Sequence, residues 1–264
     1  MEPEAILIDL DGVLYVGRTP VPGAVATISY LREHGYPFRF VSNTTRRSRE
    51  TIAGELRSMG FDISVSHIFT PSMAAVSYIK GKGGAAADIL TTPDVSAEIV
   101  REGIQQMKKG AGFLVVGDAG DLFTYSVLND ALRLLLEGAE LIALEKDRYW
   151  MGEDGMMLSA GPFVKALEYA SGKEAVVMGK PSREFFMLAL ASMNARPEHA
   201  VMIGDDVVTD VVGAVANGLF GILVRTGKFR QDSLDNAPFP PSRVIASIAD
   251  LPALLASGGL CSGK

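Results

Sequence analysis

Residues 5–15, AILIDLDGVLY, decide the fold predicted for this chain. An apolar run that is broken by Asp9 and followed by Gly12 is typical of a buried parallel strand that ends in a turn. A buried carboxylate is unfavourable unless a partner compensates its charge, so Asp9 and Asp11 indicate a bound cation and a reacting group rather than packing. The alternative is that the two residues merely start a turn, because Asp-Gly is a common turn dipeptide.

The next segments predict a strand, a helix and a second strand with tight connections. The second apolar run, residues 37–45 (PFRFVSNTT), ends in hydroxyl and amide side chains. Parallel strands of such a unit share one carboxyl edge, so we expect Ser42, Asn43 and Thr44 to lie near Asp9. These groups can cap the arginine-rich helix that follows, or hold phosphate oxygens together with backbone N–H groups. Both interpretations stay open at this point.

The middle of the chain predicts a second, smaller α/β unit inserted into the first. Its residues include a Gly/Ala-rich patch, short apolar runs and an amphipathic helix. We therefore assign residues 1–73 and 176–264 to a core and residues 74–175 to an insert. After the insert, AVVMGKP (residues 175–181) is interpreted as a strand that re-enters the core with Lys180 at its exit.

Polar residues end four of the predicted strands. In order along the chain they are Asp9 with Asp11, Ser42 with Asn43, Lys180, and Asp205 with Asp206, while Asp210 follows about one helical turn later. In an open α/β sheet such positions meet at one edge, where ligands bind. Several carboxylates repel one another unless a cation is present, and oxygen ligands suit Mg²⁺. The pattern therefore predicts a magnesium site.

Composition excludes several classes of protein. The 264 residues are 48% hydrophobic and 21% charged, which is typical of a globular chain, and the net charge of −6 gives no basic footprint for nucleic acid. No run of about 18 apolar residues suggests a membrane span, and the first residues do not read as a signal peptide. The single cysteine, Cys261, has no intrachain partner and favours a reducing, cytoplasmic location.

The motifs DLDGVLY, SN, GKP and GDD, with Asp210 after them, resemble the four signature motifs of the haloacid dehalogenase-like phosphatases. The large insert between the second and third motifs resembles the branch with a C2-type cap, which contains NagD-like and 4-nitrophenylphosphatase-like enzymes. Within that branch the chain is similar to HDHD-type proteins and to phospholysine phosphohistidine inorganic pyrophosphate phosphatases. The resemblance implies a doubly wound parallel α/β core with a smaller α/β cap domain.

The resemblance also assigns roles to individual residues. Asp9 is the expected nucleophile, and Asp11 the acid that protonates the leaving oxygen and then activates water. Asp9, Asp205 and the backbone carbonyl of Asp11 are expected to bind Mg²⁺. The acid at position 11 favours a phosphatase over a dehalogenase.

The remaining motif residues are expected to assist these groups. Ser42, Asn43, Thr44 and Lys180 would bind the phosphoryl group, with Lys180 also counted as catalytic because it neutralises charge on Asp9. Asp206 and Asp210 would orient Lys180 or a metal-bound water without ligating the metal directly.

The predicted function is a Mg²⁺-dependent phosphatase that hydrolyses small phosphomonoesters through an aspartyl-phosphate. A catalytically silent or phosphate-holding relative that acts as a binding module is the alternative. In the insert, Tyr149, Trp150 and Met151 are placed in a loop as a candidate substrate wall, although aromatic residues often serve a core or an interface. The expected partners are a small phosphorylated metabolite and a second copy of the chain, bound through the apolar helix predicted at residues 125–139.

Overall fold

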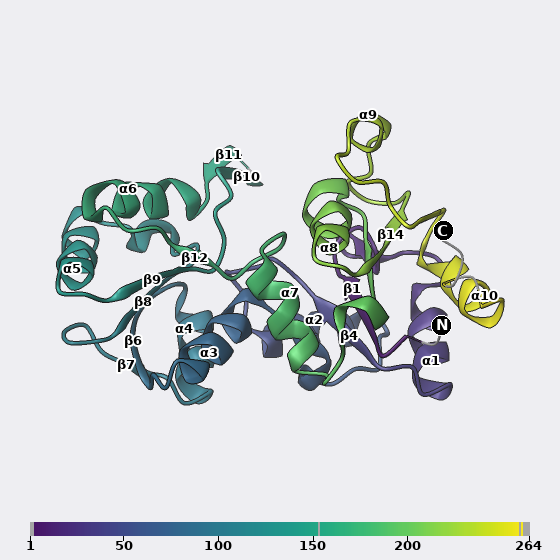
Figure 1. The fold of residues 1–264 in the computed structure, drawn as a ribbon, viewed down its shortest axis with the longest axis horizontal. Helices are drawn as coiled ribbons and strands as arrows, with labels where there is room; N and C mark the ends of the chain where they lie inside the picture. The colour runs from purple at the N-terminus through teal and green to yellow at the C-terminus, as the bar shows by residue number, and fades with distance from the viewer. Residues whose placement is uncertain (1–2, 153, 259, 261–264) are drawn as a thin grey trace. The chain divides into compact units, whose positions relative to one another are not determined.

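The computed structural model describes residues 3–152, 154–258 and 260, and the chain divides into two compact units. The first unit contains Met1–Ser42, Glu50–Phe69 and Lys180–Lys264; the second contains Asn43–Arg49 and Thr70–Gly179 (Figure 1). The predicted insert, residues 74–175, falls within the second unit, but residues 43–49, 70–73 and 176–179 also group with it rather than with the core. Cys261 lies outside the described residues.

A six-stranded parallel sheet forms the centre of the first unit. Its order is β15 (Arg243–Ile245), β14 (Phe220–Val224), β13 (Ala200–Gly204), β1 (Ala5–Asp9), β4 (Phe38–Val41) and β5 (Ile68–Phe69). The strand order therefore reverses between β1 and β13, as in a doubly wound fold. The predicted fold class is confirmed.

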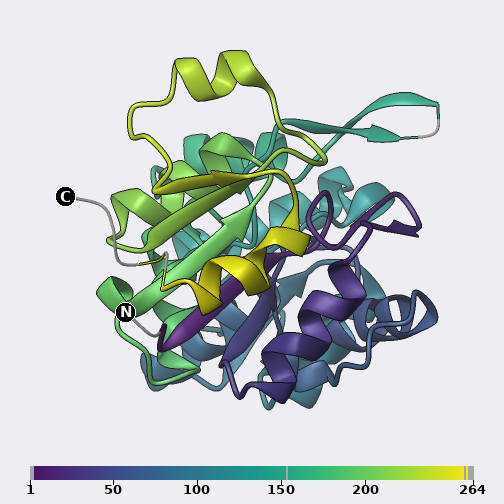
Figure 2. The same ribbon diagram turned by 90° about the vertical axis from the view of Figure 1, so that its right-hand side faces the viewer.

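Helices cover both faces of this sheet. One face packs against α1 (Ala24–Glu33), α2 (Arg49–Ser58) and α10 (Leu251–Ala256), and in Figure 2 the purple α1 and the yellow α10 lie in front of the sheet. Successive strand residues point to opposite faces, so Leu223 of β14 faces the other side, where Val211 packs on it. The chain after Lys180 forms α7 (Arg183–Ala191), and the chain after β13 forms the π-helix η4 (Val207–Val212) and then α8 (Gly213–Ala216).

The second unit has its own parallel sheet of five strands. Its order is β12 (Val176–Val177), β9 (Glu140–Ala143), β8 (Phe113–Val116), β6 (Ala86–Leu90) and β7 (Gln105–Gln106). Its helices are α3 (Pro71–Gly81), α4 (Pro93–Arg101), α5 (Tyr125–Leu136) and α6 (Gly161–Ser171). The apolar faces of α5 and α6 pack with β8 and β9 in one core cluster.

Two sequence-based predictions about the second unit are wrong. β12 is not a core strand, because Val176 pairs with Ile142 at the edge of the second sheet; a short apolar run does not specify its partner. Residues 149–151 form no loop, because β10 (Tyr149–Gly152) pairs antiparallel with β11 (Gly155–Leu158). This hairpin lies outside the five-stranded sheet, and its side chains are largely exposed.

Short elements complete the described chain. They are β2 (Tyr15–Val16), β3 (Thr19–Pro20) and α9 (Gln231–Asp235), the 3₁₀ turns η1 (Val65–His67), η2 (Gly120–Leu122), η3 (Pro197–His199) and η5 (Ile248–Asp250), and the π-helix η4 (Val207–Val212). Among the helices of the described residues, none has the length and apolar character to cross a membrane.

The buried Glu168 of α6 accepts hydrogen bonds from three donors, and these contacts stabilise the second unit. Glu168 accepts from Lys146 and Lys165, each at 2.7 Å, and from the backbone N–H of Ala175 at 2.9 Å. Burial alone would raise the pKa of Glu168, but these donors outweigh it and lower the pKa to about 2. Because the folded pKa lies below the unfolded one, the stabilisation is complete above pH 4.5 and is lost as the pH falls toward 2.

We expect the variant Glu168→Gln to lower the free energy of unfolding by on the order of 3 kcal/mol at pH 7, since one pKa unit corresponds to about 1.4 kcal/mol. The difference from the parent should shrink as the pH falls below 4.5. Urea denaturation of both proteins at several pH values measures it. The exposed Glu137 provides a matched control, and Glu137→Gln should stay close to the parent. A difference that does not change with pH would contradict the assignment.

Candidate active site

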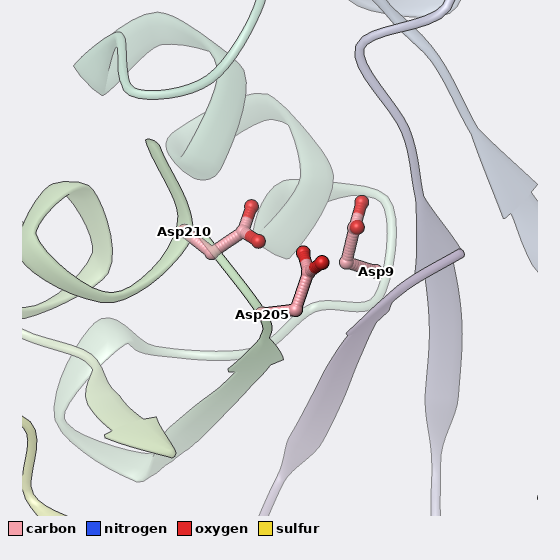
Figure 3. Close-up of side chains that lie close together, drawn as sticks. All are labelled: Asp9, Asp205 and Asp210. Carbon is pink, nitrogen blue, oxygen red and sulfur yellow. The ribbon is translucent and has the colours of Figure 1, made fainter. Parts of the chain in front are cut away.

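Two aspartates stand at the point where the strand order of the first sheet reverses. Asp9 is the last residue of β1, and Asp205 directly follows β13. The two strands are parallel neighbours in the register Ile8↔Ile203, so their carboxyl ends lie side by side (Figure 3). A crevice outside the carboxyl ends at such a reversal is where open α/β sheets bind ligands.

Asp210 joins these two residues in one carboxylate cluster. Among the described residues, Asp9, Asp205 and Asp210 each offer a carboxylate oxygen, and these oxygens lie within 4.8 Å of one another. The Lys180 ammonium lies 2.5 Å from Asp9 Oδ1 and 2.7 Å from Asp210 Oδ1. Asp205 and Asp210 are each only 1% exposed, so the charges are largely shielded from bulk water.

Burial and mutual repulsion set the protonation of the cluster. Burial raises the pKa of Asp9 and Asp210, although Lys180 opposes the shift, and it raises the pKa of Asp205 to about 6. Burial alone would lower the pKa of Lys180, but the carboxylates of Asp210 and Asp9 raise it above its usual value. Lys180 therefore stays charged, but its single positive charge does not balance the three carboxylates of the cluster.

The carboxylates fit a hard divalent cation. Asp205 Oδ1 is buried and finds no hydrogen-bond partner within the described part of the chain, which is rare for a buried oxygen. Its other oxygen, Oδ2, accepts from the backbone N–H of Lys228 at 2.6 Å. An unpartnered carboxylate oxygen beside two further carboxylates is the donor set that Mg²⁺ prefers.

A π-helix and a glycine bring Asp210 back to the cluster. Asp206 caps η4, and its Oδ1 accepts from the N–H groups of Val208 at 2.9 Å and Thr209 at 3.0 Å. The π-helix that follows is a type of element found often at functional sites. A Cβ on Gly204 would lie 2.3 Å from Asp210 Oδ2, so only glycine leaves room for that carboxylate.

The other core residues that sequence analysis predicted lie as follows. The Asp11 side chain is exposed and is not in the three-carboxylate cluster. Ser42 directly follows β4, whose Val41 pairs with Asp9. Asp206 is a helix cap, and its N–H donates to Asp210 Oδ2 at 3.3 Å, so it contributes to the position of Asp210.

Asn43 and Thr44 fall in the second unit and are half-buried, so their predicted phosphate contacts stay predictions. In the same unit the Arg46 guanidinium lies 5.3 Å from the Trp150 ring and 3.1 Å from the buried Asp118. Trp150 is 38% exposed, which excludes a core role; a role as substrate wall stays a prediction.

Sequence analysis missed the loop that follows β14. Thr226 donates its hydroxyl to the carbonyl of Gly12, and the backbone N–H of Lys228 holds Asp205. The Lys228 side chain is exposed; desolvation opposes its charge, but the nearby carboxylates, Asp9 foremost, raise its pKa. Only the position of TGK (residues 226–228) could have indicated a role for this loop. TGK follows a predicted core strand, and so do the recognised motifs.

Comparisons with known proteins agree with this geometry. A family model described as haloacid dehalogenase-like hydrolase matches residues 6–121, and a second, HAD-hydrolase-like model matches residues 177–251. The human haloacid dehalogenase-like hydrolase domain-containing protein 2 is 43% identical over 238 residues, 90% of each chain. The phospholysine phosphohistidine inorganic pyrophosphate phosphatase of Danio rerio is 40% identical over 257 residues, 95% of this chain and 92% of the relative.

Solved structures show the same fold. The p-nitrophenyl phosphatase from Archaeoglobus fulgidus has a TM-score of 0.87 and 29% identity, covering 96% of this chain and 99% of its own. NagD from the E. coli K-12 strain has a TM-score of 0.86 and 26% identity, with coverages of 95% and 98%. These matches confirm the resemblance found in the motifs. The chain therefore belongs to the haloacid dehalogenase-like hydrolases, in the branch of the NagD-like and 4-nitrophenylphosphatase-like enzymes, and is an enzyme of the phosphatase type.

Proposed function

We propose that this enzyme is a Mg²⁺-dependent phosphatase of small phosphomonoesters that works through an aspartyl-phosphate. One observation carries the proposal: Asp9, Asp205 and Asp210 form one cluster, a buried Lys180 contacts two of them, and one oxygen of Asp205 has no partner among the described residues. Such a cluster has the donors for a cation and a carboxylate nucleophile in the same place.

In the first half of the reaction Asp9 attacks phosphorus in line, and the ester P–O bond breaks as the acyl-phosphate bond forms. Lys180, at 2.5 Å from Asp9, offsets the charge of the nucleophile and of the phosphoryl oxygens that approach it. Asp210 contacts the same ammonium at 2.7 Å and helps to keep it in place. When bound, Mg²⁺ supplies the positive charge that lets a phosphate dianion approach a carboxylate.

Asp11 serves as acid and then as base. Its side chain is exposed on the turn that follows β1, two residues from the nucleophile, so it can give a proton to the leaving oxygen. In the second half it takes a proton from the water that attacks the acyl-phosphate, and inorganic phosphate leaves. Ser42, Asn43 and Thr44 are proposed to bind phosphoryl oxygens.

The other expectations extend the same proposal. Residues 74–175 would form the C2-type cap that selects a small phosphorylated metabolite, and the single cysteine supports a cytoplasmic location. A homodimer through the second unit is supported by α5, where Tyr125 and Leu136 are exposed apolar residues. The alternative, a silent relative that only binds phosphate, is not favoured, since each motif residue is present.

Steady-state hydrolysis of 4-nitrophenyl phosphate tests the proposal. We expect turnover that requires Mg²⁺, stops with EDTA and falls at least about 1000-fold in Asp9→Asn, because the nucleophile is lost. Asp62→Asn, which changes an exposed aspartate of the same unit, should keep full activity. Turnover that survives either EDTA or Asp9→Asn would contradict the mechanism.

The role of Asp11 has a separate signature in the leaving group. We expect Asp11→Asn to lower kcat/KM for an alkyl phosphate by about 10²–10⁴-fold, the usual range for a general acid. The loss with 4-nitrophenyl phosphate should be clearly smaller, because 4-nitrophenolate leaves without protonation. Since kcat/KM covers the steps up to the first irreversible one, it isolates departure of the leaving group. An equal loss for both substrates would show that Asp11 does not protonate the leaving oxygen.

A further inference from the structure

The loop after β14 joins two parts of the candidate site. The hydroxyl of Thr226 donates to the carbonyl of Gly12, in the turn that follows Asp11. Two residues later, the backbone N–H of Lys228 donates to Asp205 Oδ2 at 2.6 Å. A segment of three residues therefore holds both the turn after β1 and the carboxylate after β13.

Glycines make this contact possible by close approach. Gly227 has a φ of +61°, and a Cβ there would lie 2.1 Å from Asp205 Oδ2 and 2.4 Å from the Gly12 Cα. A Cβ on Gly12, whose φ is +85°, would lie 1.9 Å from the same oxygen. Asp205 Oδ2 thus occupies a slot between two glycine backbones that no other residue would leave open.

The slot fixes one oxygen of Asp205 and leaves the other without a partner. Oδ2 is held by the Lys228 N–H, whereas Oδ1 is buried and accepts no hydrogen bond from any described residue. A carboxylate held in this way cannot rotate to exchange its two oxygens without breaking the bond to Lys228. The loop therefore determines which oxygen of Asp205 stays available to a further ligand.

We propose that Thr226, Gly227 and the backbone of Lys228 form a positioning segment for the cation site. Their contacts aim Asp205 Oδ1 at the cation and, through the Gly12 carbonyl, fix the turn that carries Asp11. The segment acts through Asp205 and this turn. The proposal extends the proposed function, and groups that orient metal ligands typically contribute 10–100-fold to metal affinity or activity.

Cation affinity of the substrate-free protein is the first test. Isothermal titration with Mn²⁺ and with Mg²⁺ should show binding to the parent that weakens about 10-fold or more in Gly227→Ala. The matched control is Gly60→Ala, because Gly60 also has a positive φ, +93°, but no described atom lies within 4 Å of the added Cβ. Unchanged affinity in a folded Gly227→Ala, or equal losses in both variants, would overturn the proposal.

Thr226 gives a second test that keeps the backbone unchanged. We expect Thr226→Val to lower kcat about 10-fold with little change in KM and to weaken Mn²⁺ binding, and Thr226→Ser to restore both. Thr27→Val removes a comparable bond, from a buried hydroxyl to the carbonyl of Ile248, and should leave both quantities unchanged. If Thr226→Val and Thr226→Ser give the same kcat and the same Mn²⁺ affinity, the Thr226 hydroxyl has no positioning role.

The two proposals fail in different ways. A parent that binds Mn²⁺ but hydrolyses no phosphoester would contradict the proposed function, while the affinities of the variants would still decide the role of the loop. A parent that hydrolyses phosphoesters but binds neither cation would overturn the inference and leave a phosphatase of another mechanism.

Discussion

The buried contact of Lys180 with Asp9 and Asp210 is the interaction on which the rest of the site depends. Removing charged groups from water costs several kcal/mol for each ion, and one ammonium cannot balance the carboxylates gathered around it. The folded chain therefore carries uncompensated negative charge at one edge of its sheet. Binding of a cation or protonation of a carboxylate would compensate this charge. A bound cation would also assist phosphoryl transfer.

The backbone, more than the side chains, brings these charges together. Asp9 and Asp205 meet because the strand order reverses between β1 and β13, which leaves an open crevice where neighbouring connections diverge. Asp210 lies in the π-helix η4, and its carboxylate fits beside β13 because Gly204 has no Cβ. The architecture thus supplies the proximity on which the chemistry depends.

Sequence patterns predicted the parts of this site that have a local signature. A carboxylate that interrupts an apolar run marked Asp9, and a strand that ends in GDD marked Asp205. Lys180 was predicted at the end of a core strand. The strand before it instead pairs with β9 in the second sheet, so that part of the reasoning was wrong. The Thr226–Lys228 loop was missed, since a contact made by a backbone N–H leaves no residue type to recognise.

The difference between backbone and side-chain contacts also explains how the Asp205 carboxylate can be held rigidly while one of its oxygens stays available to a ligand. Side chains that compensated each carboxylate would stabilise the fold and also fill the position that a cation needs. Holding Asp205 by one N–H, between two glycines, immobilises the carboxylate and leaves Oδ1 without a partner in the described structure. A buried oxygen without a hydrogen bond destabilises the folded state, and the apolar core on both faces of the first sheet offsets that cost. A ligand that binds only the folded state stabilises it, so cation binding would raise the free energy of unfolding.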